Sequence, residues 1–265
     1  GEIKFLCEIA NPNFGIITNI GKAHLEGFES FDGVKRTKNE LFNYIRKMGG
    51  IVFLNNDDEM LRKLSTGIKS IKYGKSGDIV GEELPSSIFS ELIYNGNKIS
   101  SYLIGDYQFY NIMLAICVAD YFNINEKNII NAIKSYKPVN NRSQVIEKNS
   151  NLIILDAYNA NPSSMSKMIK SFSKIDKKNK VCILGDMAEL GDYSTEEHLV
   201  IVKLIKNLNL KYYFVGIEFL KLNQKNSFEN IDLLKKYLKN NPLSESTILV
   251  KGSRSQKLEK IIDIL

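Results

Sequence analysis

The feature that most constrains the fold is a regular alternation of short apolar runs and amphipathic segments in residues 152–264. The expected strands are Leu152–Leu155, Val181–Leu184, Tyr212–Val215 and Thr247–Val250. The expected helices are Ser163–Ile175, Thr195–Leu208, Ile231–Leu238 and Gln256–Ile264. Strands and helices that alternate in this way form a parallel sheet with helices on both faces. The sequence therefore predicts a Rossmann-like, doubly wound α/β domain.

The first half of the chain predicts a mostly parallel sheet followed by an antiparallel annex. The expected strands are Ile16–Ile20, Ile51–Leu54 and Ile68–Tyr73, with helices at Val34–Ile45 and after Asp57. Asn95-Gly96-Asn97 is a turn sequence between two further strand-like runs, which indicates a hairpin. Two helices are expected after it, at Gln108–Phe122 and Glu126–Tyr136.

A break in this pattern marks the domain boundary. Lys137–Asn141 contains Pro138 and two adjacent asparagines, which interrupt helices and favour turns. We expect one domain at residues 1–139 and a second at 140–265, and 265 residues suit two domains.

Composition narrows the class of protein. The chain has 43% hydrophobic and 25% charged residues, and its apolar runs are far shorter than the roughly 20 residues of a membrane span. Cys7, Cys117 and Cys182 are odd in number and lie in apolar stretches, as in a reducing compartment. The net charge of +6 comes from lysines interleaved with 30 acidic residues, which disfavours a nucleic-acid partner. We expect a cytoplasmic monomer without membrane insertion, and the start at Gly1 suggests a piece of a larger protein.

Polar side chains gather where four expected strands end. The four clusters are Thr18–Phe28, Asp156–Pro162, Gly185–Gly191 and Lys251–Arg254. Ligands bind beyond the carboxyl ends of strands in open parallel sheets, because loops converge there and helix N-termini attract anions. One such cluster alone is usually an ordinary polar loop, whereas four together favour a ligand site.

Single residues in these clusters leave alternatives open. His24 lies in a glycine-bounded loop, where an imidazole either reaches a metal or phosphate or is simply a surface residue. Lys38 lies on a helix with several basic residues, which is equally explained by a helix face that is exposed to solvent. Asn111 is either a packed cap or a base-reading amide. Asp156 occupies the strand-end position that often accepts ribose hydroxyls.

Two nucleotide-binding motifs are missing from these residues. Gly74-Lys75-Ser76 resembles the end of G-x-x-x-x-G-K-[ST], but Lys69 stands where the first glycine belongs. No G-x-G-x-x-G fingerprint occurs either, which disfavours a dinucleotide-dependent oxidoreductase.

Several patches from one end of the chain to the other resemble the Mur ligases. Ile17–Phe28 is similar to the family's metal-site segment. The other similar patches are Gly33–Glu40, Gly105–Asn111, Asn140–Gln144, Asp156–Pro162, Leu184–Gly191 and Val250–Arg254. Within them Asn-Ala-Asn-Pro, Gly-Asp-Met and Lys-Gly-Ser-Arg are typical of the branch that adds D-alanyl-D-alanine.

The resemblance implies a reaction and its ligands. The family uses ATP and Mg²⁺ to phosphorylate a carboxylate, and an amine then attacks the acyl phosphate to give an amide. For this branch the partners are UDP-N-acetylmuramoyl-tripeptide and D-alanyl-D-alanine, in the synthesis of peptidoglycan precursors. Metal ions and cationic side chains stabilise the transferring charges.

The resemblance also implies roles for individual residues. On the metal and nucleotide side these are His24 as Mg²⁺ ligand, Lys38 as a carbamylated lysine that helps hold a second Mg²⁺, Asn111 on adenine, Arg142 on the γ-phosphate, Asp156 on ribose and Tyr158 beside the nucleotide. On the substrate side they are Asn159, Asn161, Lys251 and Arg254, the last two for the acceptor carboxylate or the acyl phosphate.

Departures from the family pattern leave other interpretations open. Tyr107-Gln108 replaces the usual His-Asn pair before Asn111. The UDP-sugar-binding domain, the phosphate loop and an acidic metal ligand of the family have no counterpart in these residues, so we expect the 265 residues alone to be inactive. The alternatives are another branch of these ligases, including one that adds glutamate to folate, and a catalytically silent nucleotide-binding module.

Overall fold

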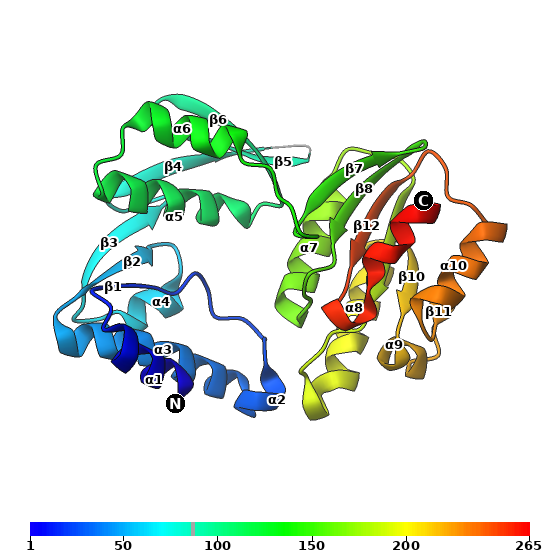
Figure 1. Ribbon diagram of the computed structural model, residues 1–265, viewed down its shortest axis with the longest axis horizontal. Helices are drawn as coiled ribbons and strands as arrows, with labels where there is room; N and C mark the ends of the chain where they lie inside the picture. Colours follow the sequence, from blue (N-terminus) through cyan, green and yellow to red (C-terminus); the bar gives the residue numbers. More distant parts are fainter. Residues whose placement is uncertain (86–87) are drawn as a thin grey trace. The chain divides into compact units, whose positions relative to one another are not determined.

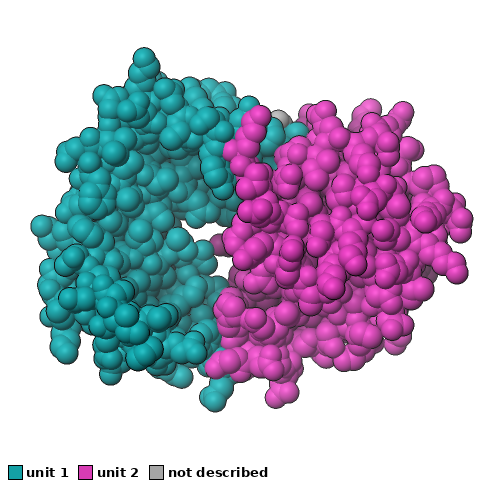
Figure 2. Space-filling model, in the orientation of Figure 1, with its two compact units in different colours: residues 1–21, 28–136 teal, residues 22–27, 137–265 magenta. Residues whose placement is uncertain are grey.

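The computed structural model describes residues 1–85 and 88–265, which form two compact units (Figure 2). The first unit comprises Gly1–Gly21 and Phe28–Tyr136, and the second comprises Lys22–Gly27 and Lys137–Leu265. Each unit contains its own sheet and core (Figure 1). The chain passes into the second unit after Tyr136, close to the boundary expected at residue 139.

The first unit is built on a six-stranded sheet with the order β1-β2-β3-β4-β5-β6. Its strands are β1 (Phe14–Ile16), β2 (Ile51–Asn55), β3 (Lys69–Gly74), β4 (Ile79–Leu84), β5 (Phe89–Tyr94) and β6 (Asn97–Ile104). Strands β1 to β4 pair in parallel, whereas β4, β5 and β6 pair antiparallel. Its helices are α1 (Glu2–Ala10), α3 (Phe31–Met48), α4 (Glu59–Leu64), α5 (Gln108–Tyr121) and α6 (Glu126–Ser135). The expected parallel sheet with an antiparallel annex is confirmed.

Strand β2 is buried on both faces. Val52 and Leu54 pack with Phe42 and Ile45 of α3, while Phe53 joins a separate cluster with residues of α5. Successive side chains of a strand point to opposite faces, so alternate residues of one apolar run pack against the helices on the two faces of the sheet. This is why β2 is a continuous run rather than an alternating pattern.

Helix α3 carries Lys38 and has well-defined ends. The Ser30 hydroxyl accepts a hydrogen bond from the Gly33 amide at 3.1 Å, and Gly49 ends the helix with a φ of 68°. A Cβ on Gly33 would lie 1.8 Å from the Phe28 carbonyl oxygen, so only glycine allows this close approach. The helix start is thereby fixed relative to the preceding loop.

The second unit contains another six-stranded sheet, with the order β11-β10-β9-β12-β8-β7. Its strands are β7 (Gln144–Lys148), β8 (Asn151–Asp156), β9 (Lys180–Gly185), β10 (Lys211–Val215), β11 (Ser227–Phe228) and β12 (Thr247–Lys251). All are parallel except β7, which pairs antiparallel with β8. Strand β12 lies between β8 and β9, so the carboxyl ends of these three strands are neighbours.

Helices cover both faces of this second sheet (Figure 1). Its helices are α7 (Pro162–Lys174), α8 (Ser194–Asn207), α9 (Ile217–Lys221) and α10 (Ile231–Asn240), with 3₁₀ turns η1 (Gly191–Tyr193), η2 (Arg254–Gln256) and η3 (Leu258–Ile264). Ile153 and Leu155 of β8 pack in one core with residues of α10 and η3. Ile154, which points to the other face, is also fully buried. The predicted doubly wound α/β domain is confirmed.

The structure corrects two expected elements. Of the expected strand Ile16–Ile20 only Ile16 is confirmed, because β1 spans Phe14–Ile16 and pairs with β2 over those residues alone. The expected α-helix Gln256–Ile264 is two 3₁₀ segments, separated by Lys257 with a left-handed φ of 50°. Elements that the sequence did not predict are α1, the four-residue helix α2 (Leu25–Phe28), β4, β7, α9 and β11.

In the described part of the chain, no helix has both the length and the apolar character needed to cross a membrane.

Candidate active site

Asp156 lies at the centre of a polar network at the carboxyl end of β8. Its Oδ1 accepts hydrogen bonds from the Ser143 amide at 3.0 Å and the Ser143 hydroxyl at 3.3 Å. Its Oδ2 lies 2.6 Å from the Lys251 Nζ. Lys251 is the register partner of Asp156 in the β12–β8 pair, so strand pairing itself brings the two charges together. The Lys251 side chain is only 3% exposed, which makes this a buried ion pair.

The segment that enters the second unit folds onto the same network. Asn140, Asn141 and Ser143 all have positive φ values, of 59°, 59° and 51°. Asparagine tolerates this left-handed region better than most residues. The guanidinium carbon of Arg142 lies 3.7 Å from the centre of the Tyr158 ring, and the Tyr158 amide donates to the Asn141 carbonyl at 3.2 Å.

The two asparagines after Tyr158 have local partners. Asn161 caps α7: its side-chain oxygen accepts from the Ser164 amide at 2.9 Å, and the Ser164 hydroxyl accepts from the Asn161 amide at 3.2 Å. Pro162 follows at the first position of the helix, where a missing N–H costs nothing. The Asn159 side-chain oxygen accepts from the Ala160 amide at 2.8 Å, and its carbonyl accepts from the Lys251 Nζ at 3.3 Å.

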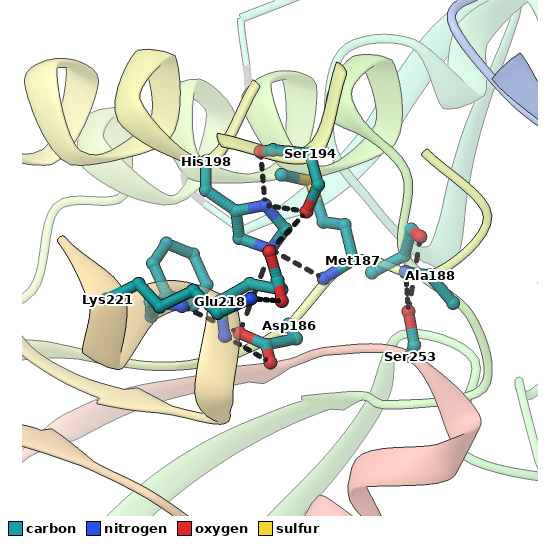
Figure 3. Close-up of polar contacts among 10 residues, drawn as sticks. Asp186, Met187, Ala188, Ser194, His198, Glu218, Lys221 and Ser253 are labelled. Carbon is teal, nitrogen blue, oxygen red and sulfur yellow. Dashed lines mark hydrogen bonds and ion pairs between the residues drawn. The ribbon is translucent and has the colours of Figure 1, made fainter. Parts of the chain in front are cut away.

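A buried polar cluster follows strand β9 (Figure 3). The Asp186 carboxylate accepts from the amides of Glu218 and Phe219 at 2.9 and 3.0 Å, which places it at the start of α9. Burial raises the pKa of Asp186, although these amides oppose the shift. Gly216 has a φ of 121°, and a Cβ there would lie 2.2 Å from the Asp186 carboxylate. Glycine is therefore required for this approach.

His198 holds the loop after β9 from the same cluster (Figure 3). Its Nε2 accepts from the Met187 amide at 3.0 Å, so its proton lies on Nδ1, which donates to the Ser194 carbonyl at 2.7 Å. The side chain is fully buried, and its ring packs edge-on against Phe219 with centroids 4.6 Å apart. The imidazole thus gives the amide of the buried Met187 a hydrogen-bond partner.

Replacing His198 with alanine is expected to lower the free energy of unfolding of the second unit by about 2–4 kcal/mol, because it leaves the amide of the buried Met187 without its partner and opens a cavity. Urea unfolding measures this change. Leu199→Ala is the matched control, since Leu199 is a neighbour on α8 with 37% exposure, and we expect at most about 0.5 kcal/mol. A loss below about 1 kcal/mol for His198→Ala would show that the cluster does not stabilise this loop.

Ser253 joins the loops after the three neighbouring strands. Its hydroxyl accepts from the Ala188 amide at 2.8 Å and donates to the Ala160 carbonyl at 3.4 Å. Its amide donates to the Asp186 carbonyl at 3.1 Å. The clusters expected at Asp156–Pro162, Gly185–Gly191 and Lys251–Arg254 are therefore contiguous. Ser143 and Ser253 were missed as individual residues, although both lie within sequence patches that signalled the site.

Residues 22–27, part of the expected cluster Thr18–Phe28, also belong to the second unit. The Lys22 Nζ lies 2.5 Å from Glu197, whose side chain is 5% exposed. The His24 imidazole makes a short contact with the Glu189 carboxylate, and the Glu26 amide donates to the Glu189 carbonyl at 3.1 Å. His24 has a left-handed φ of 54°. No group of three or more metal-binding side chains is found among the described residues.

Lys38 and Asn111 lie in the first unit. The Lys38 Nζ donates to the Asn19 carbonyl at 2.9 Å, and burial lowers the pKa of this amine. Asn111, near the start of α5, donates to the Gln108 side chain at 2.7 Å and is exposed. In the second unit Arg254 is 62% exposed and lies 3.7 Å from Glu259. The roles that combine residues of both units stay predictions.

Comparison with known proteins identifies the family. The family model for the Mur ligase middle domain matches residues 1–119, and the model for the Mur ligase, glutamate ligase domain matches residues 141–254. The chain belongs to the Mur ligase family, of which it contains the middle and C-terminal domains.

The relatives it matches carry one name. UDP-N-acetylmuramoyl-tripeptide--D-alanyl-D-alanine ligase of Buchnera aphidicola subsp. Baizongia pistaciae is 33% identical over 100% of this chain, and that of Bacillus subtilis is 29% identical over 99%. The chain spans 61% of the length of each.

Solved structures of such ligases share the fold of this chain. MurF ligase from Thermotoga maritima in complex with ADP aligns over 100% of this chain and 64% of its own, with a TM-score of 0.84 and 26% identity. MurF from Acinetobacter baumannii aligns over 98% of this chain and 61% of its own, with a TM-score of 0.82 and 25% identity.

Proposed function

We propose that this chain forms the middle domain (residues 1–139) and the C-terminal domain (residues 140–265) of an ATP-dependent ligase that joins D-alanyl-D-alanine to UDP-N-acetylmuramoyl-tripeptide. The observation that carries the proposal is the similarity to ligases of this name over 99–100% of the chain. The contiguous polar loops after β8, β9 and β12 support it, because this edge of a parallel sheet is where anionic ligands bind.

The proposed chemistry has two steps. The γ-phosphoryl group of ATP is transferred to the terminal carboxylate of the tripeptide, which gives ADP and an acyl phosphate. The free amine of D-alanyl-D-alanine then attacks the acyl carbon, the carbon–oxygen bond to phosphate breaks, and the amine loses a proton. Cationic side chains in a site shielded from water would stabilise the charge on both transferring groups.

On the nucleotide side we assign Asn111 to the adenine, Asp156 to the ribose and Arg142 to the γ-phosphate. Asp156 already accepts from Ser143 and Lys251, so the remaining lone pair of Oδ2 is the position left for a ribose hydroxyl. Arg142 rests on the ring of Tyr158, and a guanidinium stacked on an aromatic ring keeps its in-plane N–H groups for phosphate oxygens.

On the substrate side we assign Arg254 to the acceptor carboxylate or the acyl phosphate. Its exposed guanidinium supports this assignment, because a substrate group can reach it. Asn159 and Asn161 are proposed to line the same side, although the Asn161 oxygen already caps α7. Lys251 was expected on the same side, but its Nζ lies 2.6 Å from the Asp156 Oδ2 and its side chain is only 3% exposed.

His24 is the candidate ligand of one Mg²⁺ ion, and a carbamylated Lys38 would help hold a second. Mg²⁺ prefers oxygen ligands, so an ammonium group does not fit, whereas a carbamate on Lys38 would supply two oxygens. Carbamylation requires the neutral amine, and the lowered pKa of Lys38 favours that form. When bound, the metal would neutralise charge on the phosphate oxygens. The His24 imidazole, now beside Glu189, would contribute a nitrogen ligand.

Asp156→Ala is expected to raise the KM for ATP about 10- to 100-fold, because a charged hydrogen bond contributes about 1.5–3 kcal/mol. The KM for D-alanyl-D-alanine should change much less. Steady-state kinetics of the complete gene product with each substrate varied in turn measures both values. If only the dipeptide KM rose, Asp156 would belong to the acceptor pocket instead.

The test of the proposed function is a panel of acceptors. The complete gene product is incubated with ATP, Mg²⁺ and UDP-N-acetylmuramoyl-tripeptide, and ADP formation is followed with D-alanyl-D-alanine, single amino acids or glutamate. We expect ADP only with the dipeptide. ADP formation with a single amino acid, or with glutamate when a folate replaces the tripeptide, would assign the chain to another branch, and nucleotide binding without turnover on any acceptor would favour a silent binding module.

A further inference from the structure

We propose that Lys251 is a positioning residue that acts through Asp156 to fix the segment Asn140–Ser143, and with it the guanidinium of Arg142. This inference rests on the role proposed above for Arg142. It differs from the expectation that Lys251 binds the acceptor directly, because the ammonium group already has buried partners.

The first step is the placement of the Lys251 charge. Its side chain is 3% exposed, and its Nζ lies 2.6 Å from the Asp156 Oδ2 and 3.3 Å from the Asn159 carbonyl. A buried ammonium group requires a partner of opposite charge, and breaking such a pair leaves an uncompensated charge. The acceptor could therefore recruit Lys251 only by displacing Asp156.

The second step is the bond from Asp156 to the entering segment. The other carboxylate oxygen accepts both the amide and the hydroxyl of Ser143, at 3.0 and 3.3 Å. Ser143 is 5% exposed and has a φ of 51°, a conformation that costs energy for a residue other than glycine. The two bonds to Asp156 hold the backbone in that conformation.

The third step leads to Arg142, which directly precedes Ser143. Its guanidinium carbon lies 3.7 Å from the centre of the Tyr158 ring. The Tyr158 amide in turn donates to the Asn141 carbonyl at 3.2 Å, so the segment is held on both sides of Arg142. Loss of the Lys251 charge would loosen Asp156, then Ser143, and finally the placement of Arg142.

The test uses Lys251→Met in the complete gene product, with two readouts. Hydrogen exchange of the backbone amides in residues 140–143 needs no catalytic activity, and we expect it to rise about tenfold or more in the variant. In steady-state kinetics we expect kcat/KM for ATP of the Lys251→Met variant to fall about tenfold or more. The KM of this variant for D-alanyl-D-alanine should stay within about twofold of wild type. Because Lys251 acts through Asp156, adding Lys251→Met to Asp156→Ala should cost no more than about another twofold.

Lys148→Met is the matched control for loss of a partly buried lysine. The Lys148 Nζ donates to the Ile262 carbonyl at 2.7 Å, and Lys148 pairs with Asn151 at the opposite end of β8 from Asp156. This variant should lose stability and leave both readouts unchanged.

Ser143→Gly provides a second variant if Lys251→Met does not fold. Glycine is suited to a φ of 51°, so only the hydroxyl bond to Asp156 is lost. We expect exchange in residues 140–143 to rise and kcat/KM for ATP to fall about threefold, again with no added effect in Asp156→Ala. Unchanged exchange in both variants, or a higher KM for the dipeptide alone in Lys251→Met, would overturn the proposal. An inactive wild-type protein would overturn the proposed function instead, while the exchange result would still decide whether Lys251 fixes the segment.

Discussion

Lys38→Ala in the complete gene product is expected to lower the rate of ligation by about 10²- to 10³-fold. Placement of a divalent cation on transferring phosphoryl oxygens contributes several kcal/mol, and each 1.4 kcal/mol or so is a factor of ten. Lys38 is suited to carbamylation because burial lowers its pKa and its Nζ faces the Asn19 carbonyl at 2.9 Å. Alanine removes the nitrogen on which a carbamate forms.

Chemical rescue makes this prediction specific to a carboxylate-like group. High bicarbonate or a short carboxylic acid such as acetate should partly restore the rate of Lys38→Ala. Lys47→Ala is the control, since Lys47 lies exposed in the last turn of the same helix and should have nearly the wild-type rate. An unchanged rate for Lys38→Ala would remove Lys38 from the site, and a slow variant that no carboxylate rescues would argue against the carbamate.

Residues 1–265 expressed alone are expected to fold without turning over ATP. Each unit has its own sheet and buried clusters, so folding should not depend on other sequence. Turnover should fail because these residues contain no G-x-x-x-x-G-K-[ST] segment, whose amides and lysine would neutralise the β- and γ-phosphates. Weak nucleotide binding through Asn111 and Asp156 is expected to remain.

Circular dichroism measures the folding of this 265-residue protein, and phosphate release with all substrates measures its turnover. The complete gene product, assayed in parallel, is the control for substrates and conditions. Turnover equal to that control would show that the phosphates are held by residues we have not assigned. An unfolded protein would show that further sequence is needed for stability.

The pattern of apolar residues predicted the sheets, because the residues that are buried in a folded sheet are mostly apolar. The runs that became β8, β9 and β12 are buried on both faces, and such strands are continuous apolar segments. The pattern did not predict the strand where hydrogen bonding to a neighbouring strand determines its length. Strand β1 stops at Ile16 although its β-branched run continues, and β11 is only two residues long.

The sequence predicted which loops form the candidate site. It did not predict which side chains contact one another within it. The clusters after three strands were visible in the sequence because carboxyl ends of parallel strands share one edge. The pair between Asp156 and Lys251 was not, since the two residues are 95 positions apart and meet only through the β8–β12 register. The hydrogen bonds that Ser143 donates to Asp156 also depend on the left-handed backbone of Ser143. A serine in the sequence does not predict that conformation.

The most direct test of the account follows oxygen from the tripeptide carboxylate. UDP-N-acetylmuramoyl-tripeptide with ¹⁸O in its terminal carboxylate is incubated with the complete gene product, ATP, Mg²⁺ and D-alanyl-D-alanine, and the products are analysed by mass spectrometry. When the amine displaces phosphate from the acyl phosphate, the bridging carboxylate oxygen leaves with the phosphate, so we predict one ¹⁸O in each inorganic phosphate and one UDP-linked pentapeptide for each ADP. Phosphate without ¹⁸O, or a UDP-linked product that lacks the dipeptide, would contradict the account.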